Sequence, residues 1–247
     1  MQEGPPPVDW SGAPLDCASC AFADRQSAGQ CGQGWACAHD RYAKRIERFF
    51  LLNPDLADDC LDMPYFETRM NAARAASVFR LPRLLDDPDP GVRAMAILRL
   101  PARHAEERIA DPDRGVRIAV AHRLPVERLA LMARDPDGHV RAIVARRAEP
   151  GMLPLMIADA DPEIRRIAAR RVGEDWLDRF RADPDPLVRR EAAQRRPAPF
   201  VGDADLRVRC AVAECGGAEE AAALLADPEP IIRERAAERL AQLREEA

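Results

Sequence analysis

The chain has 247 residues, of which 47% are hydrophobic and 32% charged, a composition typical of a folded protein in water. Its net charge of −5 is too small to indicate a partner by itself. The first residues lack the basic and apolar regions of a secretory signal. The densest apolar run, Phe49 to Leu52, is far shorter than the ~20 residues that cross a bilayer. We therefore expect a cytoplasmic protein with no membrane partner.

Five of the seven cysteines lie in the first 62 residues. Cys17 and Cys20 form a Cys-x₂-Cys pair, Cys31 and Cys37 follow within one short segment, and Cys60 comes later. In a reducing compartment, clustered cysteines bind metal more often than they form disulfides. A Cys-x₂-Cys pair also lets one turn present two sulfurs to one centre. The spacing predicts a metal centre, with Cys60 as an alternative ligand.

The spacing alone leaves the metal open between zinc and iron–sulfur. Structural zinc sites commonly use two Cys-x₂₋₄-Cys pairs, and the gap from Cys31 to Cys37 is wider than that. The intervening residues are mostly small, which would let backbone N–H groups reach the sulfides of a cluster. Four aromatic residues could exclude water from such a centre: Trp10, Phe22, Trp35 and Tyr42.

A helix is predicted from Asp40 to Leu52, with Asp40 as its N-cap and Asn53-Pro54 as its stop. Tyr42, Ile46 and Phe49 would share one face of it. His39, just before this helix, is interpreted as a bystander rather than a ligand, because cysteines suffice.

From Asp87 onward one short motif recurs. It reads Asp, then Pro or Ala, then Asp or Glu, and it leads to Val or Ile and an invariant Arg. The copies start 24 residues apart, except for one step of 20, at Asp87, Asp111, Asp135, Asp159, Asp183, Asp203 and Asp227. A fixed period of this size indicates a solenoid. A degenerate eighth copy begins near Met63, so we expect a domain of residues 1–62 and a repeat domain of residues 63–247.

Each repeat predicts one regular helix and one short, interrupted segment. Asp suits a helix N-cap and Pro suits the first turn, and small residues follow the invariant Arg. A Leu-Pro pair often ends the helix, as at Leu100-Pro101. The remaining residues are broken by Pro and Gly and favour 3₁₀ turns over regular α-helix. No stretch alternates like a strand, so the expected fold class is all-α. Two repeat cysteines, Cys210 and Cys215, are expected to pack as core thiols.

The invariant arginines allow two interpretations. They could bind phosphate or an acidic protein, or each could pair with the capping Asp of its own or the next repeat. The equally regular Asp favours the structural interpretation. A second arginine row, beginning at Arg99, is placed at helix C-termini, where the helix dipole favours cations. Doubled arginines between residues 141 and 196 keep nucleic-acid binding as a weaker alternative.

Two known repeat patterns resemble this one. The Asp-Pro-Asp-Pro-x-Val-Arg opening resembles bacterial HEAT-like repeats, which have longer periods and two full helices. The 24-residue period with a curtailed second segment instead resembles the leucine-rich repeat variant family, over residues 63–247. That resemblance implies a right-handed helical solenoid that alternates α and 3₁₀ helices.

The cysteine segment resembles the iron–sulfur domain found at the N-terminus of some leucine-rich repeat variant proteins. This resemblance implies a [4Fe–4S] cluster held by Cys17, Cys20, Cys31 and Cys37, with zinc as the alternative.

No catalytic signature accompanies these features. The chain has four Ser and one Thr, and it contains no nucleophile elbow, P-loop or dinucleotide fingerprint. We therefore expect a non-enzymatic protein that binds a macromolecular partner, most simply a protein, with a redox or sensing role for the cluster. Three alternatives remain open. In the first, the cluster or a zinc knuckle caps the first repeat. In the second, the repeats bind nucleic acid. In the third, the protein is an enzyme whose cluster has only three cysteine ligands and so leaves an open iron site for a substrate.

Overall fold

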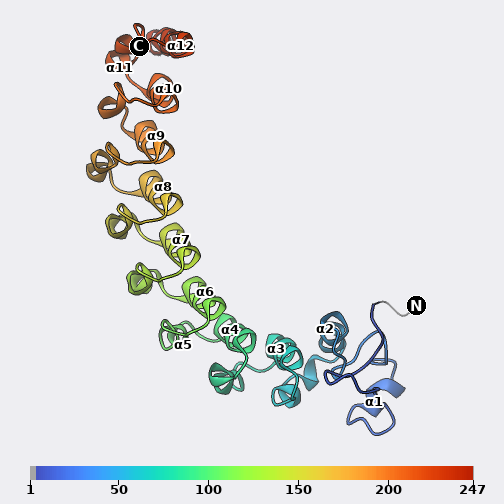
Figure 1. Ribbon diagram of the computed structural model, residues 1–247. Helices are drawn as coiled ribbons and strands as arrows, with labels where there is room; N and C mark the ends of the chain where they lie inside the picture. The colour runs from blue at the N-terminus through green and yellow to red at the C-terminus, as the bar shows by residue number, and fades with distance from the viewer. Residues whose placement is uncertain (1–3, 247) are drawn as a thin grey trace. The chain divides into compact units, whose positions relative to one another are not determined.

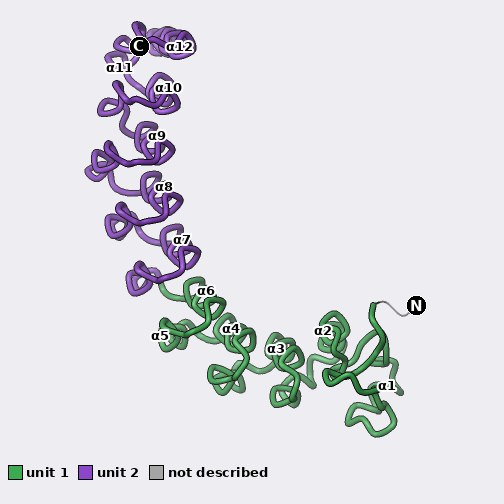
Figure 2. The backbone as a smooth tube through the Cα atoms, viewed as in Figure 1, with its two compact units in different colours: residues 1–125 green, residues 126–247 purple. Residues whose placement is uncertain are grey.

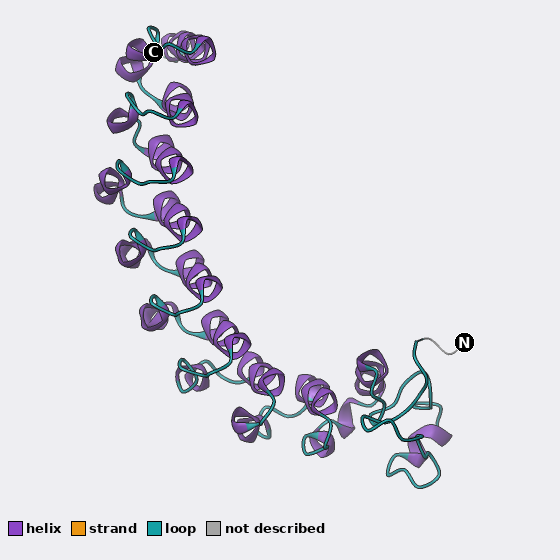
Figure 3. Ribbon diagram, in the orientation of Figure 1, coloured by secondary structure: helices purple, strands orange, loops and turns teal. Residues whose placement is uncertain are grey.

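The computed structural model describes residues 4–246, and Figure 1 traces them along the chain. Within that range the elements are helical and no strand is present, as Figure 3 shows; three isolated β-bridges lie in the N-terminal segment. The chain divides into two compact units, residues 1–125 and 126–247 (Figure 2). No helix between residues 4 and 246 has the length and apolar character needed to span a bilayer.

Unit 1 carries the cysteine segment and the first repeats. Its elements are α1 (Ala23–Ser27), α2 (Ala43–Leu52), η1 (Pro54–Leu56), η2 (Asp58–Cys60), α3 (Phe66–Ala75), η3 (Leu81–Asp86), α4 (Pro90–Arg99), α5 (Arg103–Glu106) and α6 (Arg114–Arg123), where η marks a 3₁₀ helix. Helix α2 packs on α3, α3 on α4, and α4 on α6. The boundary expected at residue 62 falls inside this unit, between η2 and α3, and stays a prediction.

Unit 2 continues the alternation. Its elements are η4 (Val126–Met132), α7 (Gly138–Arg147), η5 (Pro150–Met156), α8 (Pro162–Arg171), η6 (Glu174–Phe180), α9 (Pro186–Arg195), η7 (Ala198–Phe200), α10 (Leu206–Cys215), α11 (Ala218–Leu224) and α12 (Pro230–Glu245). Successive α-helices from α7 to α10 pack on one another, and α10 packs on α12. The all-α repeat architecture expected from the sequence is therefore confirmed.

The second segment of each repeat is mostly 3₁₀, as expected, with two exceptions. Segments α5 and α11 are α-helical. In α11 the cause is visible, since Ala218-Glu-Glu-Ala-Ala-Ala-Leu224 contains strong helix formers and no Pro. The Glu220 side chain also accepts a 2.9 Å hydrogen bond from the Gly217 backbone N–H and so caps this helix. The four-residue deletion falls in the second segment, where η7 has three residues against seven in η4, η5 and η6.

The segment expected to form a degenerate first repeat has the same elements as the later repeats. Helix α3 and η3 occupy the positions of an α–3₁₀ pair, and Arg69 makes the same contacts as its later counterparts.

The cap of each repeat helix differs from the expectation in one detail. The opening Asp of the motif was expected to be the N-cap, but the N-cap is the acidic residue two positions later. In α4, Asp89 accepts hydrogen bonds from the backbone N–H groups of Gly91 at 2.8 Å and Val92 at 3.2 Å. Equivalent side-chain caps come from Asp113, Asp137, Asp161, Asp185 and Asp205. Where Pro separates the two acids, it disfavours helical angles at the opening Asp; Ala160 and Ala204 take that place in two copies, and the opening Asp lies outside the helix there too. Its carboxylate is therefore available for another partner.

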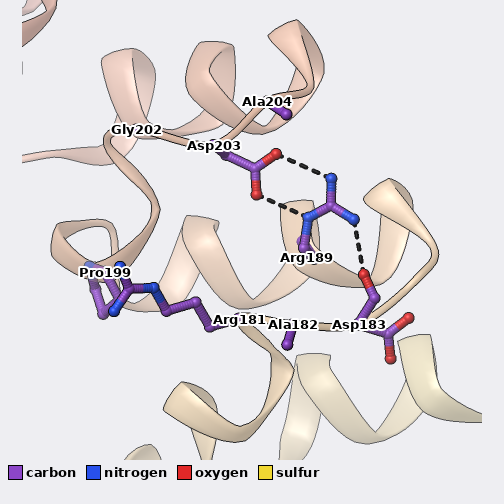
Figure 4. A pocket seen from close by; sticks show the side chains of 8 residues that line it. All are labelled: Arg181, Ala182, Asp183, Arg189, Pro199, Gly202, Asp203 and Ala204. Atoms are coloured by element: carbon purple, nitrogen blue, oxygen red, sulfur yellow. Dashed lines mark hydrogen bonds and ion pairs between the residues drawn. The ribbon is translucent and has the colours of Figure 1, made fainter.

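That partner is the invariant arginine of the preceding repeat. Figure 4 shows one example, in which the Arg189 Nε and Nη2 donate to the two carboxylate oxygens of Asp203 at 2.7 and 2.9 Å, while Nη1 donates to the Asp183 carbonyl at 2.7 Å. The same bidentate pairing joins Arg69–Asp87, Arg93–Asp111, Arg141–Asp159, Arg165–Asp183 and Arg209–Asp227. The fixed fork of the guanidinium matches the carboxylate, so each pair holds one repeat in register with the next.

The second arginine row also has a structural role. Arg171 donates to the carbonyls of Ala145 and Ala148 at 2.6 and 2.8 Å, at the C-terminal end of the preceding helix. Arg99, Arg123, Arg195 and Arg239 make corresponding bonds one repeat back. These cations satisfy carbonyl groups that have no intrahelical partner and face the negative end of the helix dipole.

The core of each repeat is narrow and formed by small residues. The Val or Ile before the invariant arginine is fully buried in the seven later repeats, at Val92, Val116, Val140, Ile164, Val188, Val208 and Ile232. The position three residues after the arginine is Ala or Val and is equally buried. Larger apolar residues of the second segments, such as Leu129, Leu153 and Phe180, complete the core. Small residues at the helix contacts let neighbouring α-helices approach closely.

Candidate metal centre

Four cysteines line one small pocket in unit 1. Cys17, Cys20, Cys31 and Cys37 contribute to its wall, and the remaining lining residues are Phe22, Ala23, Gln26, Gly32, Ala38 and Phe49. The room inside this wall is small, about 20 Å³. None of the seven cysteines forms a disulfide. Thiols from three turns of the chain thus converge on one place, with a wall that is mainly apolar.

The Cys17–Cys20 turn is held by Asp16. Its carboxylate accepts hydrogen bonds from the Ala18 backbone N–H at 2.9 Å and from the Ser19 hydroxyl at 2.6 Å. The hydroxyl bond is the main reason that the pKa of Asp16 lies below its usual range. An Asx turn of this kind fixes the chain where the two sulfurs point to one side. The carboxyl therefore positions Cys17 and Cys20 without lining the pocket.

A tight loop joins Cys31 to Cys37. Gly32 and Ala36 exchange backbone hydrogen bonds of 2.7 and 3.2 Å, and Gly34 at the tip has a φ of +80°, which favours glycine. A Cβ on Gly32 would lie 2.4 Å from the indole nitrogen of Trp35. The loop therefore needs glycine at both positions to bring Cys31 and Cys37 to the same wall.

Burial changes the acidity of the deeper thiols. It raises the pKa of Cys37 to about 11, against hydrogen bonds that the sulfur accepts from the His39 and Asp40 backbone N–H groups. The pKa of Cys31 is also raised, mainly by burial and then by the neighbouring Cys20 and Cys17. A bound metal ion supplies the positive charge that deprotonates a coordinating thiol. The two N–H donors at Cys37 suit a sulfur that carries negative charge.

Cys60 lies outside this pocket. It ends η2, is fully buried, and has a pKa raised to about 12, chiefly by burial. Its position among buried apolar residues beside α3 gives the thiol a packing role. Within residues 4–246, no three or more His, Cys, Asp or Glu side chains are close enough to share a single metal ion.

Comparison with known proteins places both parts of the chain. Residues 7–59 match the family described as "LRV protein FeS4 cluster", and residues 114–137 and 138–161 match "Leucine rich repeat variant". A solved structure described as "a leucine-rich repeat variant with a novel repetitive protein structural motif" superposes with a TM-score of 0.84 at 38% identity, covering 92% of this chain and 99% of that one. The chain belongs to the leucine-rich repeat variant family.

A curated relative covers only part of the chain. The "uncharacterized 27.7 kDa protein in nifB 3'region" of Rhodobacter capsulatus is 68% identical over 106 residues, which are 43% of this chain and 43% of that protein. The chain thus spans less than half the length of this relative.

As a leucine-rich repeat variant protein with an FeS4-type N-terminal domain, the chain has a donor set that fits an iron–sulfur cluster. Four free thiols share one pocket, and the matched residues 7–59 contain all four of them. Cys60 lies just beyond that match. All-cysteine ligation and an apolar shell are the usual surroundings of such clusters.

Of the four aromatic residues expected to shield the centre, only Phe22 lines the pocket. Trp10 is 53% exposed, whereas Trp35 and Tyr42 line a different, basic pocket. Phe49 of α2 takes the shielding position instead, and its ring centroid lies 5.3 Å from that of Phe22. The sequence signal for Phe49 was its place on the apolar face of the helix.

Helix α2 starts three residues later than expected, and its N-cap is Tyr42 rather than Asp40. Asp40 is fully buried and forms an ion pair with Arg45 at 3.0 Å. Its carboxylate also accepts a 2.8 Å hydrogen bond from the Tyr42 backbone N–H. The carboxylate therefore lies beneath the helix start, where it holds Arg45, instead of capping the first turn.

The cysteine segment docks directly on the first repeat. The buried Thr68 hydroxyl of α3 donates a 2.7 Å hydrogen bond to the carbonyl of Ala38, a pocket residue next to Cys37. The Tyr65 hydroxyl reaches the Arg41 carbonyl at 3.2 Å, and Asp58 accepts from the Ser77 backbone N–H at 2.7 Å. With α2 packed on α3, this contact covers the end of the repeat stack in unit 1.

The remaining candidate residues lie apart from the pocket. His39 does not line it; the imidazole lies against Phe22 with ring centroids 5.8 Å apart, and burial lowers its pKa.

The two repeat cysteines were expected to pack as core thiols. This was wrong for Cys215, which is exposed at the end of α10. Cys210 is only half-buried, and its sulfur lies 3.5 Å from the Glu214 carboxylate. Both occupy the outward side of a helix whose core positions are Val208, Ala211 and Val212.

Proposed function

We propose that this leucine-rich repeat variant protein is a non-enzymatic binding protein whose N-terminal domain carries a [4Fe–4S] cluster on Cys17, Cys20, Cys31 and Cys37. The repeats bind a partner protein, and the cluster serves a redox or sensing role. The observation that carries this proposal is the convergence of four free thiols on one apolar pocket. Free cysteines also agree with a cytoplasmic location, where thiols stay reduced.

When bound, a cluster of this type supplies a reversible electron couple whose potential depends on hydrogen bonds and solvent exposure. Phe22 and Phe49 keep water from the inner wall of the pocket. The His39 and Asp40 N–H groups donate to the Cys37 sulfur and so stabilise its negative charge. Four cysteine ligands leave no open iron position for a substrate, which supports a role in electron exchange or sensing rather than catalysis.

A redox titration of the anaerobically purified protein tests this role. We expect one reversible couple in the wild-type protein and in Cys60→Ala, because Cys60 lies outside the pocket. Cys20→Ala should lose it. Absence of a reversible couple in the wild-type protein would contradict the redox function, and loss of the couple in Cys60→Ala would contradict the ligand set.

A protein partner is favoured over nucleic acid by the positions of the arginines. The invariant row is occupied by bidentate bonds to Asp, and the second row by backbone carbonyls. Of the remaining doubled arginines, Arg166 and Arg170 both reach Glu191, at 3.6 and 2.6 Å. Few of these cations are therefore left to follow a phosphate backbone. Tight binding of DNA or RNA at low salt, lost steeply as salt rises, would contradict this preference.

A structural cap is the second candidate function, and the docking of α2 and Ala38 on α3 favours it. The end of a solenoid must hide an apolar face, and a centre that holds residues 17–38 in place would stabilise that cover. If so, Cys17→Ala should lower the melting temperature and helicity of the repeats. Full retention of both in the cluster-free protein would contradict the capping role and leave the redox role unaffected.

A further inference from the structure

A second pocket in unit 1 combines basic and aromatic side chains. It is lined by Gly34, Trp35, Tyr42, Lys44, Arg45 and Arg48. Lys44 is the only lysine in the chain. No cysteine lines this pocket, so it is distinct from the cysteine pocket.

One loop contributes to both pockets. Gly32 and Cys37 line the cysteine pocket, whereas Gly34 and Trp35 between them line the basic pocket. Gly32 lies directly against the Trp35 indole. The Cys37 backbone N–H also donates a 3.1 Å hydrogen bond to the carbonyl of Arg45, which lines the basic pocket. A molecule seated in the basic pocket would therefore be separated from the cysteine pocket by this single loop.

The charges at the basic pocket divide into a buried and an exposed set. Arg45 is buried against Asp40, donates at 2.7 Å to the Pro5 carbonyl, and lies over the Tyr42 ring at 5.4 Å. Lys44 and Arg48 also line the pocket and are exposed, and Arg48 Nη1 donates a 3.5 Å hydrogen bond to the Trp35 carbonyl. Within helix α2 the one acid, Glu47, is exposed and pairs with Arg74 of α3 at 3.2 Å. The rim is thus basic, and its inner wall is fixed by packing.

We propose that this basic pocket, next to the cysteine pocket, is the docking site for an acidic electron-carrier protein. The inference rests on the redox role proposed above and gives it a partner chemistry. Trp, Tyr and Arg are the residues that most often dominate binding energy at protein interfaces. A basic rim attracts an acidic surface and speeds its approach. A groove for nucleic acid would need basic residues over a longer path than this one segment provides.

The transfer that such docking serves is a one-electron exchange. A reduced [2Fe–2S] ferredoxin would lose one electron and become oxidised, and Cys17, Cys20, Cys31 and Cys37 would hold the cluster that accepts this electron. No proton or covalent bond is involved. The role of this chain's residues is to bind the carrier and to keep the path short.

The test uses the full-length protein with its cluster and an acidic plant-type [2Fe–2S] ferredoxin as the probe. Two charge-reversal variants are compared. K44E/R48E changes the pocket rim, and R80E/R103E changes two exposed arginines of the same unit by the same net charge. Affinity is measured by calorimetry, and reduction is followed optically with ferredoxin and, separately, with photoreduced deazaflavin, a small reductant that needs no docking site.

We expect ferredoxin to bind and to reduce the wild-type protein and R80E/R103E, with rates that fall as salt rises. In K44E/R48E, affinity and ferredoxin-driven rate should each fall about tenfold or more, while reduction by deazaflavin stays unchanged.

Three results would overturn the docking site. The first is equal ferredoxin affinity and rate in the wild-type protein and in K44E/R48E. The second is a wild-type protein that deazaflavin reduces but ferredoxin does not. Binding of single-stranded DNA that K44E/R48E abolishes would assign the pocket to nucleic acid instead. If neither ferredoxin nor deazaflavin reduces the wild-type protein, the proposed redox function itself fails, and the two failures are thereby distinguished.

Discussion

Gly32 connects two features of the cysteine segment. It lines the cysteine pocket, and its α-carbon lies so close to Trp35 that a methyl group would lie 2.4 Å from the indole nitrogen. At the level of single residues, the site depends on such small residues as much as on the four sulfurs. They let the chain turn sharply between ligands without filling the pocket.

Gly32→Ala is therefore expected to destabilise unit 1. Moving the indole to admit one methyl group should cost about 1–3 kcal/mol of unfolding free energy, and it should lower the iron bound per chain. Urea denaturation followed by circular dichroism, with an iron assay, measures both. Gly151→Ala is the matched control, since nothing lies within 4 Å of its added methyl. Equal effects of the two substitutions would show that the loop tolerates the methyl group.

Consecutive repeats are held in register by ion pairs between an arginine of one repeat and an aspartate of the next. Arg69 and five of its later counterparts bond to the opening Asp of the following repeat, and both side chains of each pair are nearly buried; in the Arg165–Asp183 pair they are 10% and 6% exposed. Removing one member of such a pair leaves the other charge without its partner in a poorly solvated place.

Arg165→Met should lower the free energy of unfolding by about 3 kcal/mol, because Asp183 loses its bidentate partner. Arg181→Met, at an exposed arginine of the same unit, should change it by less than about 0.5 kcal/mol. Chemical denaturation of both variants supplies the comparison. A loss at Arg165 no larger than at Arg181 would mean that the arginine–aspartate row does not stabilise the stack.

The contact between α3 and the cysteine segment is a second link at this scale. Thr68→Val keeps the shape of the side chain but removes the hydrogen bond to the Ala38 carbonyl. Leaving that buried carbonyl unpaired should cost about 1–3 kcal/mol and speed amide hydrogen exchange in α3 (Phe66–Ala75). Ser77→Ala, which keeps the backbone N–H bonded to Asp58, is the control. Unchanged exchange in α3 for Thr68→Val would argue against a coupled interface.

The sequence predicted those features that depend on neighbouring residues in the chain, and it missed those that depend on contacts between elements. The period, the proline-broken second segments and the regular Asp and Arg positions were local signals, and they predicted the repeat, the 3₁₀ turns and the arginine pairing. The shift of the cap from Asp87 to Asp89 was missed, because Asp87 is bound by Arg69 of the preceding repeat, a contact between repeats that the local pattern does not show. Phe49 was correctly placed on the apolar face of its helix but was missed as a shielding residue, and Cys215 was wrongly expected in the core. Both depend on neighbouring elements, which periodicity does not describe.

For the whole molecule, the summed ion pairs make stability depend on pH. The pKa of Asp227 is lowered, chiefly by the hydrogen bond from Arg209. Burial opposes the shift at Asp111 and Asp159, but the bonds from Arg93 and Arg141 prevail there and lower the pKa of each. A carboxyl with a lowered pKa stabilises the fold fully above its unfolded pKa of about 3.9 and loses that contribution as pH falls through the folded value.

We therefore expect the urea midpoint of the repeats to be steady from pH 7 down to about pH 5 and to fall below about pH 4. Arg209→Met should show a smaller fall than the wild-type protein, because it removes the hydrogen bond that chiefly lowers the pKa of Asp227. A midpoint that does not change between pH 7 and pH 3 would contradict this dependence.

The identity of the metal centre decides between the two candidate functions, because the redox function requires the four cysteines to hold an iron–sulfur cluster, whereas a zinc centre could still serve as a cap. The most direct test is the visible absorption spectrum of the protein purified without oxygen, with iron, sulfide and zinc assayed on the same sample. We predict a broad brown absorption band with about four iron and about four sulfide per chain. A colourless protein with about one zinc per chain would contradict the account and make the N-terminal segment a zinc knuckle.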